Sequence, residues 1–176
     1  MSHSLSFSSS SSLSFDASLL LVQEAGGAYR AAQAHEVLQA AQALLFSRVR
    51  QLEVMSSPAV VRDFLRVRLG ALEHEMFAVM HLDAQNRVID YVEMFRGTVT
   101  QTSVYPREIV KEALARNSAA LLLVHNHPSG VTQPSRADEA LTVALKSALA
   151  LVDVRVLDHL IVAGPEILSF AERGLL

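Results

Sequence analysis

This sequence of 176 residues contains no cysteine. The absence excludes disulfide bonds, cysteine-ligated zinc sites and a cysteine nucleophile at the same time. Any bound metal ion must then be held by histidine, aspartate or glutamate side chains. That ligand set suits zinc at a catalytic site.

Positive charge is also scarce. The chain has 15 Lys and Arg against 18 Asp and Glu, which gives a net charge of −3. A general nucleic-acid-binding surface needs a basic face that displaces counterions, so the charge argues against this class. The sequence also has no run of basic and aromatic residues of the kind that stacks single strands. Nucleic acid is still a possible partner, but the net charge does not support nucleic-acid binding.

Long hydrophobic runs are missing as well. The first 22 residues hold no Lys or Arg, and their longest apolar stretch, Leu19–Val22, is too short for a signal peptide. The longest apolar-rich segment, Leu141–Val152, is interrupted by Thr142, Lys146 and Ser147, so it cannot span a bilayer. We therefore expect a cytoplasmic protein with no membrane partner. Its oligomeric state is not encoded in any pattern that we recognise.

The residues that are present divide into three parts. Residues 1–16 are dominated by serine, and we expect a disordered tail there. Residues 17–56 predict an N-terminal arm made of a short hairpin that turns on Gly26-Gly27, followed by a helix over His35–Leu52. Residues 57–176 predict the main domain. Because 51% of the chain is hydrophobic, it has enough apolar residues to form a packed core.

Strands and helices alternate in the main domain, which indicates an α/β fold with a mixed central sheet and helices on both faces. Ser57-Pro58 is a helix-start pattern, with Ser57 as N-cap. The predicted elements are a helix over 58–72, a hairpin of strands Glu75–Leu82 and Val88–Phe95, a helix over Pro106–Arg116 with Ile109, Val110, Ala113 and Leu114 on one side, a buried strand over Ala119–Val124, a helix over Ser135–Leu151 and a strand over Val154–Val162 that ends at Gly164-Pro165.

The chemistry is concentrated after the buried strand. His125 and His127 are two residues apart in extended chain, so their side chains point to the same side. Pro128 and Gly130 then turn the chain into a loop, which delivers Asp138 into the first turn of the next helix. Two imidazoles and one carboxylate leave a fourth position for water, as a catalytic zinc site requires. Such a site also needs a base, and Glu75 and Glu73 are the two candidates near the mouth of a strand.

These residues resemble a known motif. A Glu, then His-x-His, seven residues, and Ser-x-x-Asp is the pattern of the JAMM metallopeptidases, which have the MPN fold. Further segments resemble the RadC family within that group: Glu75-Met76-Phe77, Phe95-Arg96-Gly97-Thr98, Tyr105-Pro106-Arg107-Glu108, His125 to Gly130, and Asp158-His159. The resemblance covers residues 57–176, and we expect no counterpart of the helix-hairpin-helix region that precedes this domain in full-length RadC proteins.

The resemblance implies a cytidine-deaminase-like α/β/α sandwich that binds Zn²⁺. His125, His127 and Asp138 would be the metal ligands, Glu75 the general base, and Ser135 a hydrogen-bond donor to the water or to the developing oxyanion. Deaminases of this fold need a Pro-Cys-x-x-Cys motif. Because the chain has no cysteine, deamination is excluded.

Four of these residues also have simpler interpretations. Ser135 and Asp138 form a helix-capping pattern, which is compatible with a ligand role for Asp138. Glu75 taken alone reads as a solvated strand end. His159 next to Asp158 resembles an imidazole oriented by a carboxylate, but a satisfied core histidine is the preferred interpretation.

Two functions follow. The leading hypothesis is a zinc-dependent hydrolase that cleaves a peptide or isopeptide bond, with a protein or peptide as substrate. The alternative is a RadC-like binding module associated with DNA repair or recombination, in which the metal site is structural or vestigial. The sequence does not identify the substrate.

Overall fold

The computed structural model describes residues 20–50, 53–97 and 103–176, so the predicted tail over residues 1–16 lies outside the described residues. No helix in this part of the chain has the length and apolar character needed to cross a membrane. The elements in chain order are β1 (Leu21–Gln23), β2 (Tyr29–Ala31), α1 (Ala34–Val49), η2 (Val54–Ser56), α2 (Pro58–Leu69), β3 (Met76–Leu82), β4 (Val88–Arg96), α3 (Pro106–Ala115), β5 (Ala120–Asn126), α4 (Arg136–Ala150), β6 (Arg155–Ala163) and β7 (Glu166–Ser169).

The chain divides into two compact units, residues 1–40 and 41–176. In the first unit β1 and β2 pair antiparallel, and Gly27 between them has a φ of 82°, which favours glycine. The predicted hairpin is therefore confirmed. The helix α1 starts in this unit and ends at Val49, whereas the predicted end at Leu52 lies outside the described residues. The predicted domain boundaries at residues 16 and 56 stay predictions.

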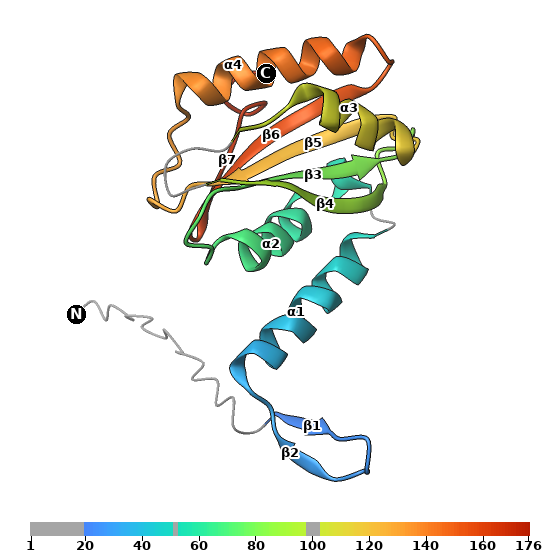
Figure 1. The fold of residues 1–176 in the computed structure, drawn as a ribbon, viewed down its shortest axis with the longest axis vertical. Helices are drawn as coiled ribbons and strands as arrows, with labels where there is room; N and C mark the ends of the chain where they lie inside the picture. The colour runs from blue at the N-terminus through green and yellow to red at the C-terminus, as the bar shows by residue number, and fades with distance from the viewer. Residues whose placement is uncertain (1–19, 51–52, 98–102) are drawn as a thin grey trace, which may run out of the picture. The chain divides into compact units, whose positions relative to one another are not determined.

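The second unit is built on a five-stranded sheet with the order β4-β3-β5-β6-β7. β3 pairs antiparallel with β4 and with β5, β5 pairs parallel with β6 through the crossover helix α4, and β7 returns antiparallel on β6. Helix α2 covers one face of the sheet, and α3 and α4 cover the other (Figure 1). This is the mixed α/β sheet with helices on both faces that the sequence predicts.

Each face of the sheet has its own hydrophobic core, because alternate residues of a buried strand point to opposite sides. Leu122 and Val124 of β5 pack in the core on the α2 side, together with Phe64. Leu121 and Leu123 pack in the core on the α3 and α4 side. The unbroken apolar run of β5 is thus explained by burial on both faces.

The structure corrects three details. Pro58 does begin α2, but Ser57 makes no capping hydrogen bond through its side chain, because its ψ of 53° departs from the extended backbone of a capping residue. Leu114, which the sequence pattern groups with Ile109 on one side of α3, is 52% exposed, whereas Ile109 is buried. Leu114 lies about 140° around the helix from Ile109. Finally, β7 was not predicted, since four residues carry too little periodicity to identify an edge strand.

Candidate metal centre

The end of β5 holds the two histidines on one side of the sheet. His125 lies within β5 opposite Phe77 of β3, and the two rings stack with centroids 6.4 Å apart. The chain stays extended past the strand because the backbone N–H of His127 donates to the carbonyl of Val162 on β6 at 2.8 Å. As predicted for this spacing, the rings come together, with 2.9 Å between the two Nε2 atoms.

Asp138 reaches the histidines from the first turn of α4. Ser135 is the N-cap: its Oγ accepts from the backbone N–H of Asp138 at 3.2 Å, and the backbone N–H of Ser135 donates to Oδ2 of Asp138 at 2.7 Å. This reciprocal capping box is confirmed. It fixes the carboxylate so that Oδ1 lies 3.3 Å from Nε2 of His125 and Oδ2 lies 3.6 Å from Nε2 of His127.

Three ligand atoms therefore converge, all within 4.8 Å of one another, from His125, His127 and Asp138. The other nitrogen of His127, Nδ1, lies 2.7 Å from the carbonyl oxygen of Val131 in the loop before α4. A carbonyl only accepts, so Nδ1 carries the proton and donates. This arrangement leaves Nε2 of His127 as the nitrogen that faces the other two ligand atoms. A His-His-Asp group with this geometry could bind a metal ion.

The charges of the group are strongly coupled. Hydrogen bonding to Asp138 is the main cause that raises the pKa of His127, against the opposing effect of burial. Burial alone would raise the pKa of the Asp138 carboxyl, but the hydrogen bonds from His125 and His127 hold it well below its usual range. Asp138 is thus ionised at neutral pH, as a metal ligand must be.

Glu75 immediately precedes β3 and is half-buried, whereas Glu73 is exposed. Because β3 runs antiparallel to β5, the start of β3 lies beside the end of β5, near the metal ligands. The charge of Glu75 is one of the causes that raise the pKa of His127, so the carboxylate lies close enough to act on that ring. Of the two candidate bases, Glu75 is thereby the one supported by location.

The segment that carries Glu75 is held by Asn126, a residue that sequence reasoning missed. Asn126 is 2% exposed, and its side chain points to the side opposite the two histidines. Its Oδ1 accepts from the backbone N–H of Met76 at 2.8 Å, and its Nδ2 donates to the carbonyl of His74 at 3.0 Å. The amide thus fixes the backbone on both sides of Glu75. No local pattern signals this contact, because it depends on β3 and β5 being neighbours.

His159 of β6 lies directly behind His125. The ring is fully buried, Nε2 lies 2.8 Å from Nδ1 of His125, and Nδ1 lies 2.6 Å from the hydroxyl of Thr142 on α4. Burial and then the neighbouring charge of His125 hold the pKa of His159 well below its usual range. His159 is a satisfied core histidine, as preferred, and also a hydrogen-bonding partner of a candidate ligand.

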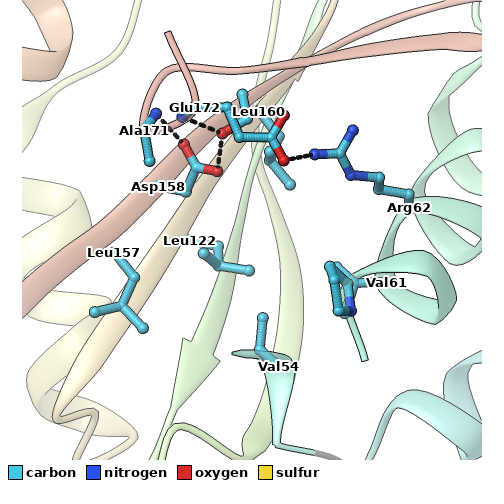
Figure 2. Close-up of a pocket in the computed structure, with 11 residues that line it drawn as sticks. Val54, Val61, Arg62, Leu122, Leu157, Asp158, Leu160, Ala171 and Glu172 are labelled. Atoms are coloured by element: carbon cyan, nitrogen blue, oxygen red, sulfur yellow. Dashed lines mark hydrogen bonds and ion pairs between the residues drawn. The ribbon is translucent and has the colours of Figure 1, made fainter. Parts of the chain in front are cut away.

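The neighbouring Asp158 does not orient that ring. Adjacent strand residues point to opposite faces, and Asp158 lies on the α2 side (Figure 2). Its Oδ1 accepts from the backbone N–H of His159 at 2.7 Å and of Ala171 at 2.9 Å, and its Oδ2 accepts from the hydroxyl of Ser169. The carboxylate lines a mainly apolar pocket of about 220 Å³, whose rim carries the ion pair of Arg62 and Glu172.

Comparison with known proteins agrees with this site. Residues 55–175 match the family described as RadC-like JAB domain. A UPF0758 protein of Leptothrix cholodnii is 58% identical over 160 residues, which cover 91% of this chain and 72% of the relative. UPF0758 proteins of Methylibium petroleiphilum and Aromatoleum aromaticum are also 58% identical, over 150 and 151 residues that cover 85% of this chain and 68% and 67% of the relatives. The names of these relatives specify no activity.

Proposed function

This chain belongs to the RadC family of JAB domains, and from that premise we propose that it is a zinc-dependent hydrolase that cleaves a peptide or isopeptide bond. Membership alone fits either a hydrolase-like or a DNA-repair-associated role. The observation that favours the hydrolase is the convergence of His125, His127 and Asp138 within 4.8 Å. A carboxylate that could serve as base, that of Glu75, acts on the same group.

The spacing of the ligand atoms supports zinc. Two ligands bound at 2.0–2.1 Å to a tetrahedral zinc ion lie about 3.4 Å apart. The separations here are 2.9 Å between the Nε2 atoms, 3.3 Å from His125 to Asp138, and 3.6 Å from His127 to Asp138. Two imidazoles suit zinc better than they suit magnesium or calcium, which prefer oxygen. Three protein ligands also leave a coordination position for water or substrate.

Each residue has a separate task in the proposed reaction. Bound zinc supplies Lewis acidity, which polarises a carbonyl group and lowers the pKa of water. Glu75 accepts the proton of the attacking water and passes it to the leaving amine. Ser135 donates a hydrogen bond to the developing oxyanion. Its hydroxyl donates to Oδ2 of Asp138 at 2.7 Å, which places it at the edge of the ligand group. Because a hydroxyl has one proton, it would turn from Asp138 to the oxyanion during the reaction.

The experiment is a cleavage screen with the full chain loaded with zinc, against libraries of peptides and isopeptide-linked peptides. The matched controls are Glu75→Gln, which should keep zinc and lose cleavage, and Asp138→Ala, which should lose zinc. Single-stranded DNA binding is titrated against salt in parallel. Cleavage that disappears in Glu75→Gln supports the hydrolase. Salt-dependent DNA binding by a zinc-loaded chain that cleaves nothing supports the binding module instead.

A further inference from the structure

Behind His125 lies a chain of hydrogen bonds that runs through two side chains with no proposed part in the reaction. We infer that Thr142 and His159 are positioning residues that fix the tautomer of His125, so that its Nε2 is free of a proton and faces the metal. The inference rests on the proposed metal site. It follows from counting the protons available along the chain of hydrogen bonds.

The count starts at Thr142, which has one hydroxyl proton. The hydroxyl lies 2.7 Å from the backbone carbonyl of Asp138, four residues earlier on α4, and donates to it. Ser and Thr hydroxyls commonly bond the carbonyl four residues back in a helix. The single proton of Thr142 is therefore used. Its oxygen can only accept from Nδ1 of His159, which lies 2.6 Å away.

His159 must then carry a proton on Nδ1. The ring is fully buried, and the nearest carboxylate in sequence, that of Asp158, is bonded on the opposite face of the sheet. Burial disfavours a doubly protonated imidazole there more strongly than the charge of Asp138 favours it. His159 is accordingly neutral, with a proton on Nδ1 and a free lone pair on Nε2.

That lone pair decides the state of His125. Nδ1 of His125 lies 2.8 Å from Nε2 of His159 and must donate to it. A neutral imidazole carries one proton, so Nε2 is the nitrogen that His125 leaves to a metal ion. When no metal is bound, a second proton on Nε2 can donate to Oδ1 of Asp138, 3.3 Å away, which is the hydrogen bond that lowers the pKa of Asp138. His127 reaches the same tautomer independently, by donating from Nδ1 to the carbonyl of Val131.

The chain of hydrogen bonds begins and ends at the same residue, Asp138. Asp138 contributes its carboxylate to the ligand group and its backbone carbonyl to the start of the proton chain. Between these two ends lie Thr142, His159 and His125. Partners of this kind normally affect metal affinity by about 10–100-fold when they are removed. A hydroxyl that never touches the ligand atoms should therefore control how tightly zinc binds.

The test replaces Thr142. Thr142→Val keeps the side-chain shape and removes the hydroxyl. His159 is then free to move its proton to Nε2, which forces the proton of His125 onto its own Nε2. We expect a loss of about 10–100-fold in zinc affinity, measured by competition with a chromophoric chelator. Thr142→Ser should restore the affinity. Ser147→Ala is the matched control, because it removes the same type of hydroxyl bond, to the carbonyl of Val143, from the same helix.

The tautomers are read directly by long-range ¹H–¹⁵N correlation spectra of the imidazoles. In the metal-free wild type His125 should be protonated on Nδ1, a readout that needs no variant and no turnover. A wild type whose His125 carries a proton on Nε2 and none on Nδ1 overturns the inference, and so does Thr142→Val with wild-type affinity. If the wild type itself binds no zinc, the proposed metal site has failed. If it binds zinc and Thr142 has no effect, only the present inference has failed.

Discussion

Asn126→Ala should destabilise the fold without removing the metal. The asparagine amide holds the backbone of the segment around Glu75 through two short hydrogen bonds, 2.8 Å from the Met76 N–H and 3.0 Å to the His74 carbonyl, and a longer one of 3.5 Å to the Leu72 carbonyl. A buried backbone group that loses its partner costs about 1–3 kcal/mol. Since Met76 and His74 are half-buried, water replaces part of each bond. We take about 1 kcal/mol for each, and expect the free energy of unfolding to fall by about 2 kcal/mol.

Two assays check this. Equilibrium denaturation measures the free energy, and hydrogen exchange measures the Met76 amide, whose protection should fall by a factor of up to about 30. Zinc content should stay at the wild-type level, because the Asn126 side chain points away from the ligand histidines.

The matched control is Gln42→Ala. It removes another amide with two hydrogen bonds, to the Val67 carbonyl and from Arg68, and should leave Met76 exchange unchanged. Ordinary surface substitutions change stability by up to about 0.5 kcal/mol. If Asn126→Ala costs less than that and leaves hydrogen exchange at Met76 unchanged, Asn126 does not hold this segment.

Three further predictions concern single side chains. Glu75→Gln should keep zinc and lose most cleavage of any substrate found, whereas Glu73→Gln should remain active; the reverse result would assign the base to Glu73. Ser135→Ala should lower the free energy of unfolding by about 1 kcal/mol in denaturant and Ser135→Thr by much less, so equal losses would argue against a cap. Burial lowers the pKa of His81 to about 4 in the folded protein. As the pH falls, His81 is therefore protonated in the unfolded chain before it is protonated in the folded one. Stability should fall by up to about 3 kcal/mol between about pH 6.5 and pH 4, and an unchanged slope in His81→Leu would contradict this.

Local sequence patterns predicted much of the fold and of the candidate ligand group. The apolar run before His125 predicts a strand buried on both faces, and the spacing of His125 and His127 puts both rings on one side. Ser135 and Asp138 are three residues apart, which is the spacing of a capping box, and the box is what fixes the Asp138 carboxylate. Each of these features depends only on residues that are close in the chain.

The supporting residues could not be found in the same way. Asn126 bonds the segment before β3 across 50 residues of chain, and His159 meets His125 only because β5 and β6 are parallel neighbours. Both contacts depend on strand order, which local periodicity does not contain. One signal was available for Asp158: adjacent residues of a strand point to opposite faces, so this carboxylate could not orient the His159 ring.

The central claim is that His125, His127 and Asp138 hold a metal ion, and elemental analysis tests it most directly. The full chain, purified without chelator and dialysed against trace zinc, should carry close to one zinc per chain. A variant with His125→Ala, His127→Ala and Asp138→Ala together should carry almost none, with its fold verified by circular dichroism. A folded triple variant that still holds one zinc per chain would contradict the claim.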